Sequence, residues 1–207
     1  MQFAGMLARD GLTKDLRILI GAAVATWHAN WPDVTAWVEI ARQRADQRQD
    51  LEETLLQCIL FCGFPRAITA FEHLANGWPA EQPPSGGGLP VEQRTPAGDE
   101  LFRSIYGKYD AAVRAMLVGY HQELHDFVLE AAYSRILTRP QLTAKKRELI
   151  AVAVLAAQGQ KRQFAGHARG AKHLGATVEE LREALVTTFG AEPERAEEIA
   201  YWMSLVR

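Results

Sequence analysis

Residues 142–175, LTAKKRELIAVAVLAAQGQKRQFAGHARGAKHLG, decide the fold because they join an almost wholly apolar segment to a polar one. After its first residue, the segment from Glu148 to Ala157 is apolar on every side, which predicts a helix that is buried all round. The pair Gln158 and Gly159 then ends this helix. We therefore expect a central core helix over these residues.

The polar segment that follows predicts a second helix with one inward face. Its residues at helical spacing are Phe164, His167, Ala168, Ala171 and Leu174. His167 lies on this inward stripe, so we expect it to meet Glu148 inside the protein. Gly175 suits a left-handed C-cap, and Thr177 with Glu180 forms a capping box that opens the next helix.

The composition is that of a soluble globular chain. Its 207 residues are 48% hydrophobic and carry a net charge of −2, which gives no sign of a nucleic-acid or acidic-membrane partner. A local basic cluster is expected to be solvated surface; it consists of Lys145, Lys146, Arg147, Lys161, Arg162 and Arg169. No apolar run of about 20 residues and no signal-peptide core is evident, so we expect a cytoplasmic protein.

Cys58 and Cys62 lie four residues apart in a predicted helix, and therefore on one face of it. Helical geometry presents the two Cβ atoms poorly for a disulfide, which favours two reduced core thiols. A redox pair is the alternative, although such pairs usually have C-x-x-C spacing.

The chain contains an internal repeat, in which residues 12–24 align with residues 142–154. Seven of the thirteen aligned positions are identical, among them Arg17 and Arg147. Continued in the same register, the alignment pairs Glu53 with Glu183, so we expect an ancient duplication. Asp50 and Glu53 also suggest a second capping box, whose alignment with Thr177 and Glu180 requires a slightly different register.

The first copy lacks the polar pattern of the second, because Ile18 replaces Glu148 and Trp37 replaces His167. Residues 79–98 are rich in proline and glycine and are predicted to be a linker. This linker divides a degenerate first repeat (1–78) from a second repeat (99–207) that carries the candidate site. Helices are expected near 50–60, 99–106, 110–119 and 121–138, with a turn at residues 63–65.

His121 and His125 are spaced as zinc ligands can be, with Glu123 between them. An HExxH site would need the glutamate directly after the first histidine, where Gln122 stands, so no metal site is predicted. No strand pattern of any length occurs, and the predicted fold class is all-α.

The residues RELIAVAVLAAQGQ…H…RGA…LGAT, preceded by AYSRILTRPQL, resemble the carboxymuconolactone decarboxylase family within the alkyl hydroperoxidase D-like superfamily. This resemblance implies a fold of two tandem helical repeats. The hydroperoxidase branch has a C-x-x-C-x-x-x-H element with an earlier glutamate, and the matching positions here are Glu148, Gln160, Gln163 and His167. Glutamine forms no thiolate, so the chain is more similar to the decarboxylase branch.

The resemblance implies a cofactor-independent lyase that acts on a small carboxylated lactone or a related acid of aromatic catabolism. His167 is then the candidate general acid/base and Glu148 the group that orients it. Arg139 or Arg147 would bind the substrate carboxylate, and Gln160 and Gln163 are further candidate substrate-binding residues. The alternative interpretation makes His167 a hydrogen-bonded core residue and both arginines helix-end caps.

Two other functions stay open. The chain could be a non-catalytic helical assembly or binding module, since one copy lacks the polar residues, or a thiol peroxidase-like protein that uses Cys58 and Cys62. We also expect a homo-oligomer, with a trimer favoured. Units of about 80–110 residues cannot fully cover helices that are apolar all round.

Overall fold

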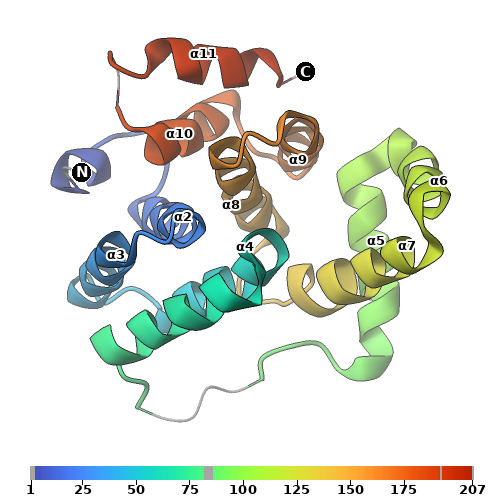
Figure 1. Cartoon of the computed structure of the whole chain (residues 1–207), viewed down its shortest axis with the longest axis horizontal. Helices are drawn as coiled ribbons and strands as arrows, with labels where there is room; N and C mark the ends of the chain where they lie inside the picture. Colours follow the sequence, from blue (N-terminus) through green and yellow to red (C-terminus); the bar gives the residue numbers. More distant parts are fainter. Residues whose placement is uncertain (1–2, 82–85, 192, 207) are drawn as a thin grey trace.

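The chain is all-α, as predicted. The computed structural model describes residues 3–81, 86–191 and 193–206, and these ranges contain helices and no strand (Figure 1). The elements are α1 (Phe3–Leu7), α2 (Lys14–Trp27), α3 (Trp31–Gln43), α4 (Arg48–Gly77), α5 (Val91–Tyr106), η1 (Gly107–Tyr109), α6 (Asp110–Tyr120), α7 (Gln122–Phe127), η2 (Val128–Leu137), α8 (Ala144–Ala157), α9 (Lys161–His173), α10 (Val178–Phe189) and α11 (Ala196–Ser204).

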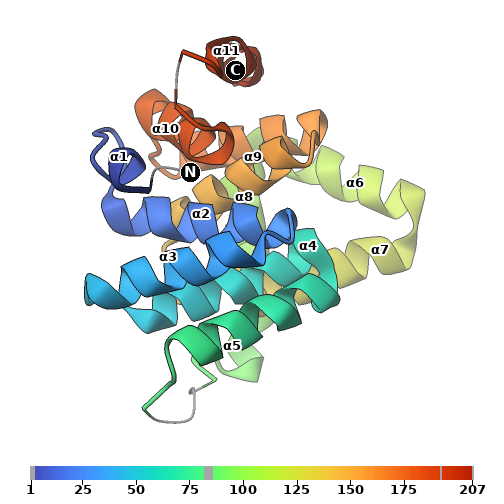
Figure 2. The same cartoon turned by 60° about the vertical axis from the view of Figure 1, so that its left-hand side comes forward.

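Two apolar helices, α2 and α8, form the centre of the protein. Residues 16–26 of α2 and 147–156 of α8 are all buried, which confirms the predicted core helix. Figures 1 and 2 show α3 and α4 on one side of this pair and α9, α10 and α11 on the other. One apolar core runs through all of these helices and contains residues from both halves of the chain.

The ends of the core helices follow the expected local chemistry. Thr143 caps α8 by accepting a hydrogen bond from the backbone N–H of Lys146. Thr177 and Glu180 form the predicted capping box at the start of α10. The second predicted box is wrong, because α4 begins at Arg48 with Gln47 as its N-cap.

The helix boundaries repeat in the register seen in the sequence. When residues 12–24 are aligned with 142–154, α8 begins and ends at the positions equivalent to the ends of α2. In the same register α9 matches α3 at both ends, and α10 begins where α4 begins. Such a correspondence is what a duplication would leave, although the duplication itself stays a prediction.

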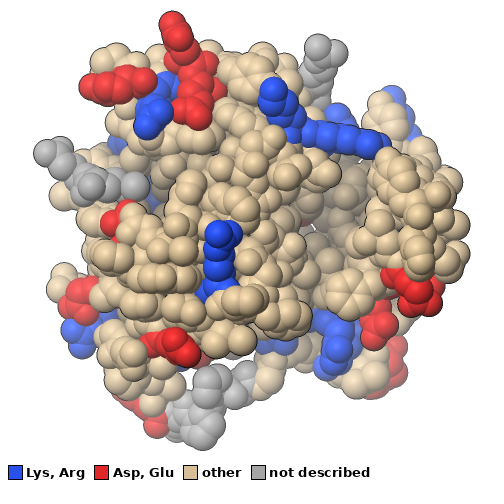
Figure 3. All heavy atoms as spheres, viewed as in Figure 1, with Lys and Arg blue, Asp and Glu red and all other residues tan. Residues whose placement is uncertain are grey.

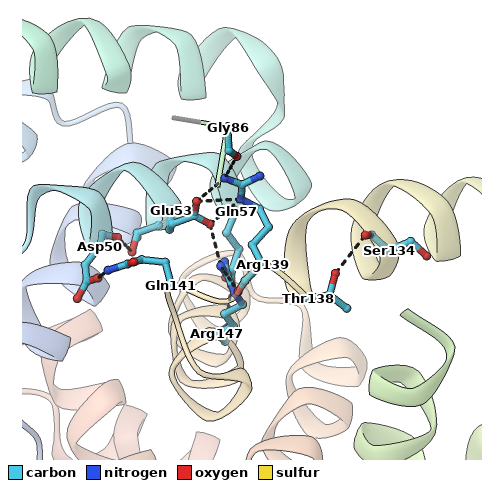
Figure 4. Close-up of polar contacts among 10 residues, drawn as sticks. Asp50, Glu53, Gln57, Gly86, Ser134, Thr138, Arg139, Gln141 and Arg147 are labelled. Atoms are coloured by element: carbon cyan, nitrogen blue, oxygen red, sulfur yellow. Dashed lines mark hydrogen bonds and ion pairs between the residues drawn. The ribbon is translucent and has the colours of Figure 1, made fainter. Parts of the chain in front are cut away.

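Two buried ion-pair clusters join the halves reciprocally. In one, Glu53 of α4 accepts from Arg147 of α8 at 2.8 Å and from Arg139 at 2.7 Å (Figure 4). In the other, Glu183 of α10 accepts from Arg17 of α2 at 2.6 Å and also from Arg9. Each residue of the second cluster aligns with its counterpart in the first. The two halves therefore hold each other through equivalent contacts.

The structure corrects the predicted linker and the clean division into two units. α5 begins at Val91, so residues 91–98 are helical and only the earlier part of the stretch connects two helices. Residues 82–85 of the predicted linker lie outside the described residues. The shared core also shows that residues 12–74 and 142–202 pack as one body.

α4 consists of two helical segments joined at Gly63, whose angles are not helical (φ 76°, ψ 166°), so the turn predicted at residues 63–65 is present. At this break the side-chain amide of Gln158 donates to the carbonyl of Phe61, at 2.7 Å. Contrary to the sequence prediction, α4 has the length and apolar composition to cross a membrane. About a third (33%) of its most apolar stretch is buried in the protein, and Leu51 and Leu55 of α4 lie in the core.

A smaller cluster of apolar residues lies between α5 and η2; its buried members are Phe102, Ile105, Tyr133 and Leu137. The helix predicted over 121–138 begins at Gln122, because His121 has extended backbone angles, and it continues from Val128 to Leu137 as the π-helix η2. Beyond this cluster, α6 and α7 stand apart from the main body in both views and contain no fully buried residue (Figures 1 and 2).

Candidate functional site

Glu148 is a buried carboxylate on the central helix α8. Its side chain is 1% exposed and lies in the second turn, after the polar residues that begin the helix. A carboxylate removed from water needs a hydrogen-bonding or charged partner to offset its lost hydration. The identity of that partner therefore decides what the site can do.

His167 of α9 is that partner. Its Nδ1 lies 2.9 Å from Oε2 of Glu148, so the contact predicted from the sequence is present. The imidazole is 14% exposed, and the ring of Phe61 meets it edge-on with the centroids 6.0 Å apart. With Nδ1 held by the carboxylate, Nε2 is the nitrogen left for a ligand.

The pair alters the protonation of the histidine. Burial alone would lower the pKa of His167, but the charge of Glu148 and the hydrogen bond to it outweigh burial and raise this pKa above its usual 6.5. A larger share of His167 is therefore protonated at neutral pH than for a free imidazole. Such a group can deliver a proton to a bound molecule and recover it from solvent.

A third helix, α5, packs closely against α9 beside the His167–Glu148 pair. A Cβ atom on Gly170 of α9 would lie 2.8 Å from Oε2 of Glu148 and 2.7 Å from Cγ2 of Ile105. Only glycine therefore allows α5 to pack here. Nδ1 of His173 lies 3.0 Å from the carbonyl oxygen of Ile105 and fixes the end of α5.

Two tyrosines near the pair were missed by the sequence analysis. The hydroxyl of Tyr133 in η2 donates to that of Tyr106 at the end of α5, at 3.1 Å. Burial raises the pKa of both, and the negative charge of Glu148 adds to the rise. Their protons are therefore retained near the carboxylate. The two tyrosines lie on different helices far apart in the sequence, so their contact leaves no periodic signal there.

The two predicted arginines are placed elsewhere. Arg147 is 1% exposed and Arg139 is 14% exposed, and both bind Glu53 (Figure 4). Arg147 also donates to the carbonyl of Arg139 and to Gln57. A buried carboxylate of the protein therefore occupies both arginines, and substrate binding by either one stays a prediction.

The two predicted glutamines lie at the open end of α9. Gln160 is its N-cap residue and makes no side-chain capping bond, and both Gln160 and Gln163 are exposed. They precede His167 by seven and four residues, so at helical spacing they lie on the same side of the chain as His167. Their part in substrate binding stays a prediction.

The other polar candidates have local roles. Nδ1 of His121 accepts from the backbone N–H of Glu123 at the start of α7, and His125 pairs with Asp126. The described residues contain no group of three or more side chains suited to a metal ion.

The two cysteines are free thiols. A hydrogen bond between them raises the pKa of buried Cys58, with burial adding to the rise, and lowers that of partly exposed Cys62. Arg66 lowers the pKa of Cys62 further.

A cavity of about 650 Å³ lies between α5, α6, α7 and η2, away from the histidine. Its lining alternates Arg94, Arg114 and Arg135 with Asp99, Asp126 and Glu130. Arg114 is ion-paired there with Asp99. Neither His167 nor Glu148 lines it.

Comparisons with known proteins agree with the sequence pattern around the pair. The model of the carboxymuconolactone decarboxylase family matches residues 122–189, a range that contains Glu148 and His167. Peroxisomal protein 2 of Schizosaccharomyces pombe is 26% identical over 191 residues, which cover 86% of this chain and 87% of that protein. The 4-carboxymuconolactone decarboxylase of Acinetobacter baylyi is 29% identical over 96 residues, covering 46% of this chain and 72% of the enzyme. The likeness to the carboxymuconolactone decarboxylase family thus covers the part of the chain that carries the His167–Glu148 pair.

Proposed function

We propose that the chain is a carboxymuconolactone decarboxylase-like lyase that needs no cofactor and acts on a small carboxylated lactone or a related acid. The observation that carries this proposal is the 2.9 Å contact between a partly exposed His167 and a buried Glu148. The similarity to a 4-carboxymuconolactone decarboxylase supports the reaction class.

Loss of carbon dioxide leaves an electron pair on the substrate carbon, which an adjacent carbonyl can hold as an enolate. The step is complete when an acid protonates that carbon. In our proposal His167 delivers this proton from Nε2, while Glu148 holds the ring by Nδ1 and stabilises the imidazolium. The Tyr106 hydroxyl, held by Tyr133, is a neutral donor suited to the enolate oxygen.

Replacing His167 is the direct test. A screen of carboxylated lactones, followed by release of carbon dioxide, should identify a substrate. We expect His167→Asn to lower kcat/KM for it by about 100-fold or more, since general acid/base groups contribute 10²–10⁴-fold. The exposed His28 at the end of α2 provides the matched control, and His28→Asn should keep the wild-type rate.

The pH profile separates a chemical role from a structural one. If protonated His167 is the acid, activity falls as pH rises through its raised pKa. Glu148→Gln removes the charge that raises this pKa, so the fall should move to lower pH. Saturable binding of acids without turnover would instead favour a binding module. Hydroperoxide turnover that is lost in Cys58→Ser would favour the thiol-based alternative.

We also propose that the chain forms a homo-oligomer, with a trimer favoured. Support comes from α6 and α7, which contain no fully buried residue and expose the large side chains of Tyr120, Leu124 and Phe127. Light scattering at micromolar concentration should give three times the chain mass of 23.0 kDa. A clean monomer would remove this proposal.

A further inference from the structure

One face of α9 carries two arginines and a glycine, Arg162, Gly166 and Arg169, at positions i, i+4 and i+7. This face points toward η1 and α6, because Arg162 contacts α6 and the guanidinium of Arg169 lies 5.7 Å over the ring of Tyr109. Figure 3 shows the surface hollowed between the main body and the α6–α7 arm. The α9 face therefore borders an open groove.

The side chain of Arg162 crosses this groove and makes only weak contacts with α6. Its Nη1 donates to the hydroxyl of Tyr120 at 3.3 Å, and its Nη2 contacts the sulfur of Met116. A phenol oxygen and a thioether sulfur are both neutral, whereas a guanidinium binds a carboxylate about twice as strongly and often through two hydrogen bonds. An anion would therefore readily displace the contacts of Arg162 with Tyr120 and Met116.

Arg169 also lacks a carboxylate partner among the described residues, and its ring contact leaves its donor groups available. The contrast with Arg17, Arg139 and Arg147 is clear, since each of those is ion-paired with a buried glutamate. The negative charge of Glu148 and the positive charge of Arg169 act in opposite directions on the pKa of Tyr106. Arg169 and the His167–Glu148 pair thus approach the same region.

Gly166 provides the space between the two arginines. No heavy atom lies within 4 Å of the position that a Cβ on Gly166 would occupy. His167 is the next residue and lies about 100° further round α9, so it borders this face of the helix. Seven residues of helix separate the arginine Cα atoms by about 10 Å, and both side chains can bend inward over that distance.

We propose that Arg162 and Arg169 bind the substrate as a carboxylate-binding pair, with the ligand lying over Gly166 and one carboxylate on each guanidinium. This inference rests on the proposed function for the position of the reacting carbon, and it replaces Arg139 and Arg147 as the anion anchors. Arg162 leaves Tyr120 and Met116 when the ligand enters. Arg162 therefore spans the groove in the free protein and selects for negative charge when the ligand enters.

Binding of a simple dicarboxylate tests the pair without requiring turnover. Isothermal titration calorimetry would compare adipate with hexanoate and 1,6-hexanediol, which have the same chain length and one or no carboxylate. We expect adipate to bind the wild-type protein most tightly and the diol not at all. Arg162→Gln and Arg169→Gln should each weaken adipate binding by about tenfold, which is typical for one charge-assisted contact.

Two further variants separate charge from space. Lys161→Gln is the matched control, because the Lys161 ammonium lies 5.0 Å over Tyr201 of α11 and outside the groove; its affinity for adipate should stay within about twofold. Gly166→Val keeps both arginines but fills the space between them, and should abolish binding. Circular dichroism would confirm that each variant keeps its helix content.

Three outcomes would overturn the pair: no adipate binding to the wild type at about 10 mM, equal affinity in the two arginine variants and the wild type, or an equal loss in Lys161→Gln. The result is independent of the proposed reaction. Adipate binding that depends on both arginines, in a protein that releases no carbon dioxide from any lactone, would keep the anion site and remove the lyase function.

Discussion

Replacing Glu53 with glutamine is expected to lower the free energy of unfolding by about 3–5 kcal/mol, the usual loss when one member of a buried ion pair is removed. The glutamate is 4% exposed and bonds both Arg139 and Arg147, the second of which is 1% exposed. Glutamine has nearly the same shape but no charge. Both guanidiniums would then lose their ion-pair partner, and α4 would lose a charged contact with α8.

Denaturant unfolding followed by circular dichroism measures this loss. Glu52→Gln is the matched control, since Glu52 neighbours Glu53 in α4 and pairs with Arg48 one turn away, where both side chains are partly exposed. That variant should lose only about 0.3–0.5 kcal/mol, as helix surface pairs do. Equal losses in the two variants would show that burial adds nothing to the Glu53 contacts.

The same cluster predicts a pH dependence. Burial alone would raise the pKa of Glu53, but hydrogen bonds and charge from Arg139 and Arg147 outweigh it and hold the pKa below 4.5. A lowered carboxyl pKa stabilises the fold above the unfolded-state value and loses this contribution as pH falls through the folded-state value. The difference in stability between wild type and Glu53→Gln should therefore be full above pH 4.5 and shrink below it.

The helices were predictable because hydrophobic periodicity and capping residues are local signals. The capping box of Thr177 and Glu180 and the apolar run after Glu148 are both present in the structure. The contact between Glu148 and His167 was predictable for the same reason, since each lies on an inward position of its own helix. To predict this contact, we further assumed only that α8 packs against α9.

The partner of the arginines was not predictable locally, because one residue along a helix turns the side chain by about 100°. Arg147 directly precedes Glu148 in the sequence, yet it bonds Glu53 on α4 while Glu148 faces α9. The repeat contained the missing signal. Arg17 and Glu53 of the first copy are equivalent to Arg147 and Glu183 of the second, although the first copy lacks the His167 pattern. Residues present in both copies are better explained by a shared structural role.

The second half of the predicted linker is helical instead, because glycine can allow close helix packing as well as chain flexibility. Gly98 was interpreted as a sign of flexibility, but a Cβ there would lie 2.3 Å from the hydroxyl of Ser134 and 2.9 Å from its backbone. The glycine instead allows α5 to pack closely on η2. A long-range contact of this kind leaves no mark in local composition, and neither does the tyrosine pair.

Gly170→Ala should disrupt the candidate site and destabilise the fold, whereas the same substitution one turn earlier should not. A Cβ on Gly170 would lie 2.8 Å from the Glu148 carboxylate and 2.7 Å from Ile105, so one of the two must move. Overpacking of a core contact typically costs about 1–3 kcal/mol. Because Oε2 of Glu148 is also the atom bonded to His167, its displacement should weaken that hydrogen bond.

Gly166→Ala provides the matched control on the same helix. The new methyl group meets no atom within 4 Å, and alanine favours a helix over glycine by about 0.5–1 kcal/mol. Thermal unfolding should therefore shift down for Gly170→Ala and slightly up for Gly166→Ala. Two variants that shift in the same direction by similar amounts would show that α5 and Glu148 do not restrict position 170.

Titration of His167 by NMR adds a measurement that fold stability alone would not change. The raised pKa of this residue depends on the charge and hydrogen bond of Glu148. When Gly170→Ala moves the carboxylate away, the imidazole pKa should fall toward or below 6.5, since burial then acts with less opposition. In Gly166→Ala the pKa should keep its wild-type value. A folded Gly170→Ala protein with an unchanged His167 pKa would show that the pair does not need the close approach of α5, and the catalytic assignment would then have to stand without it.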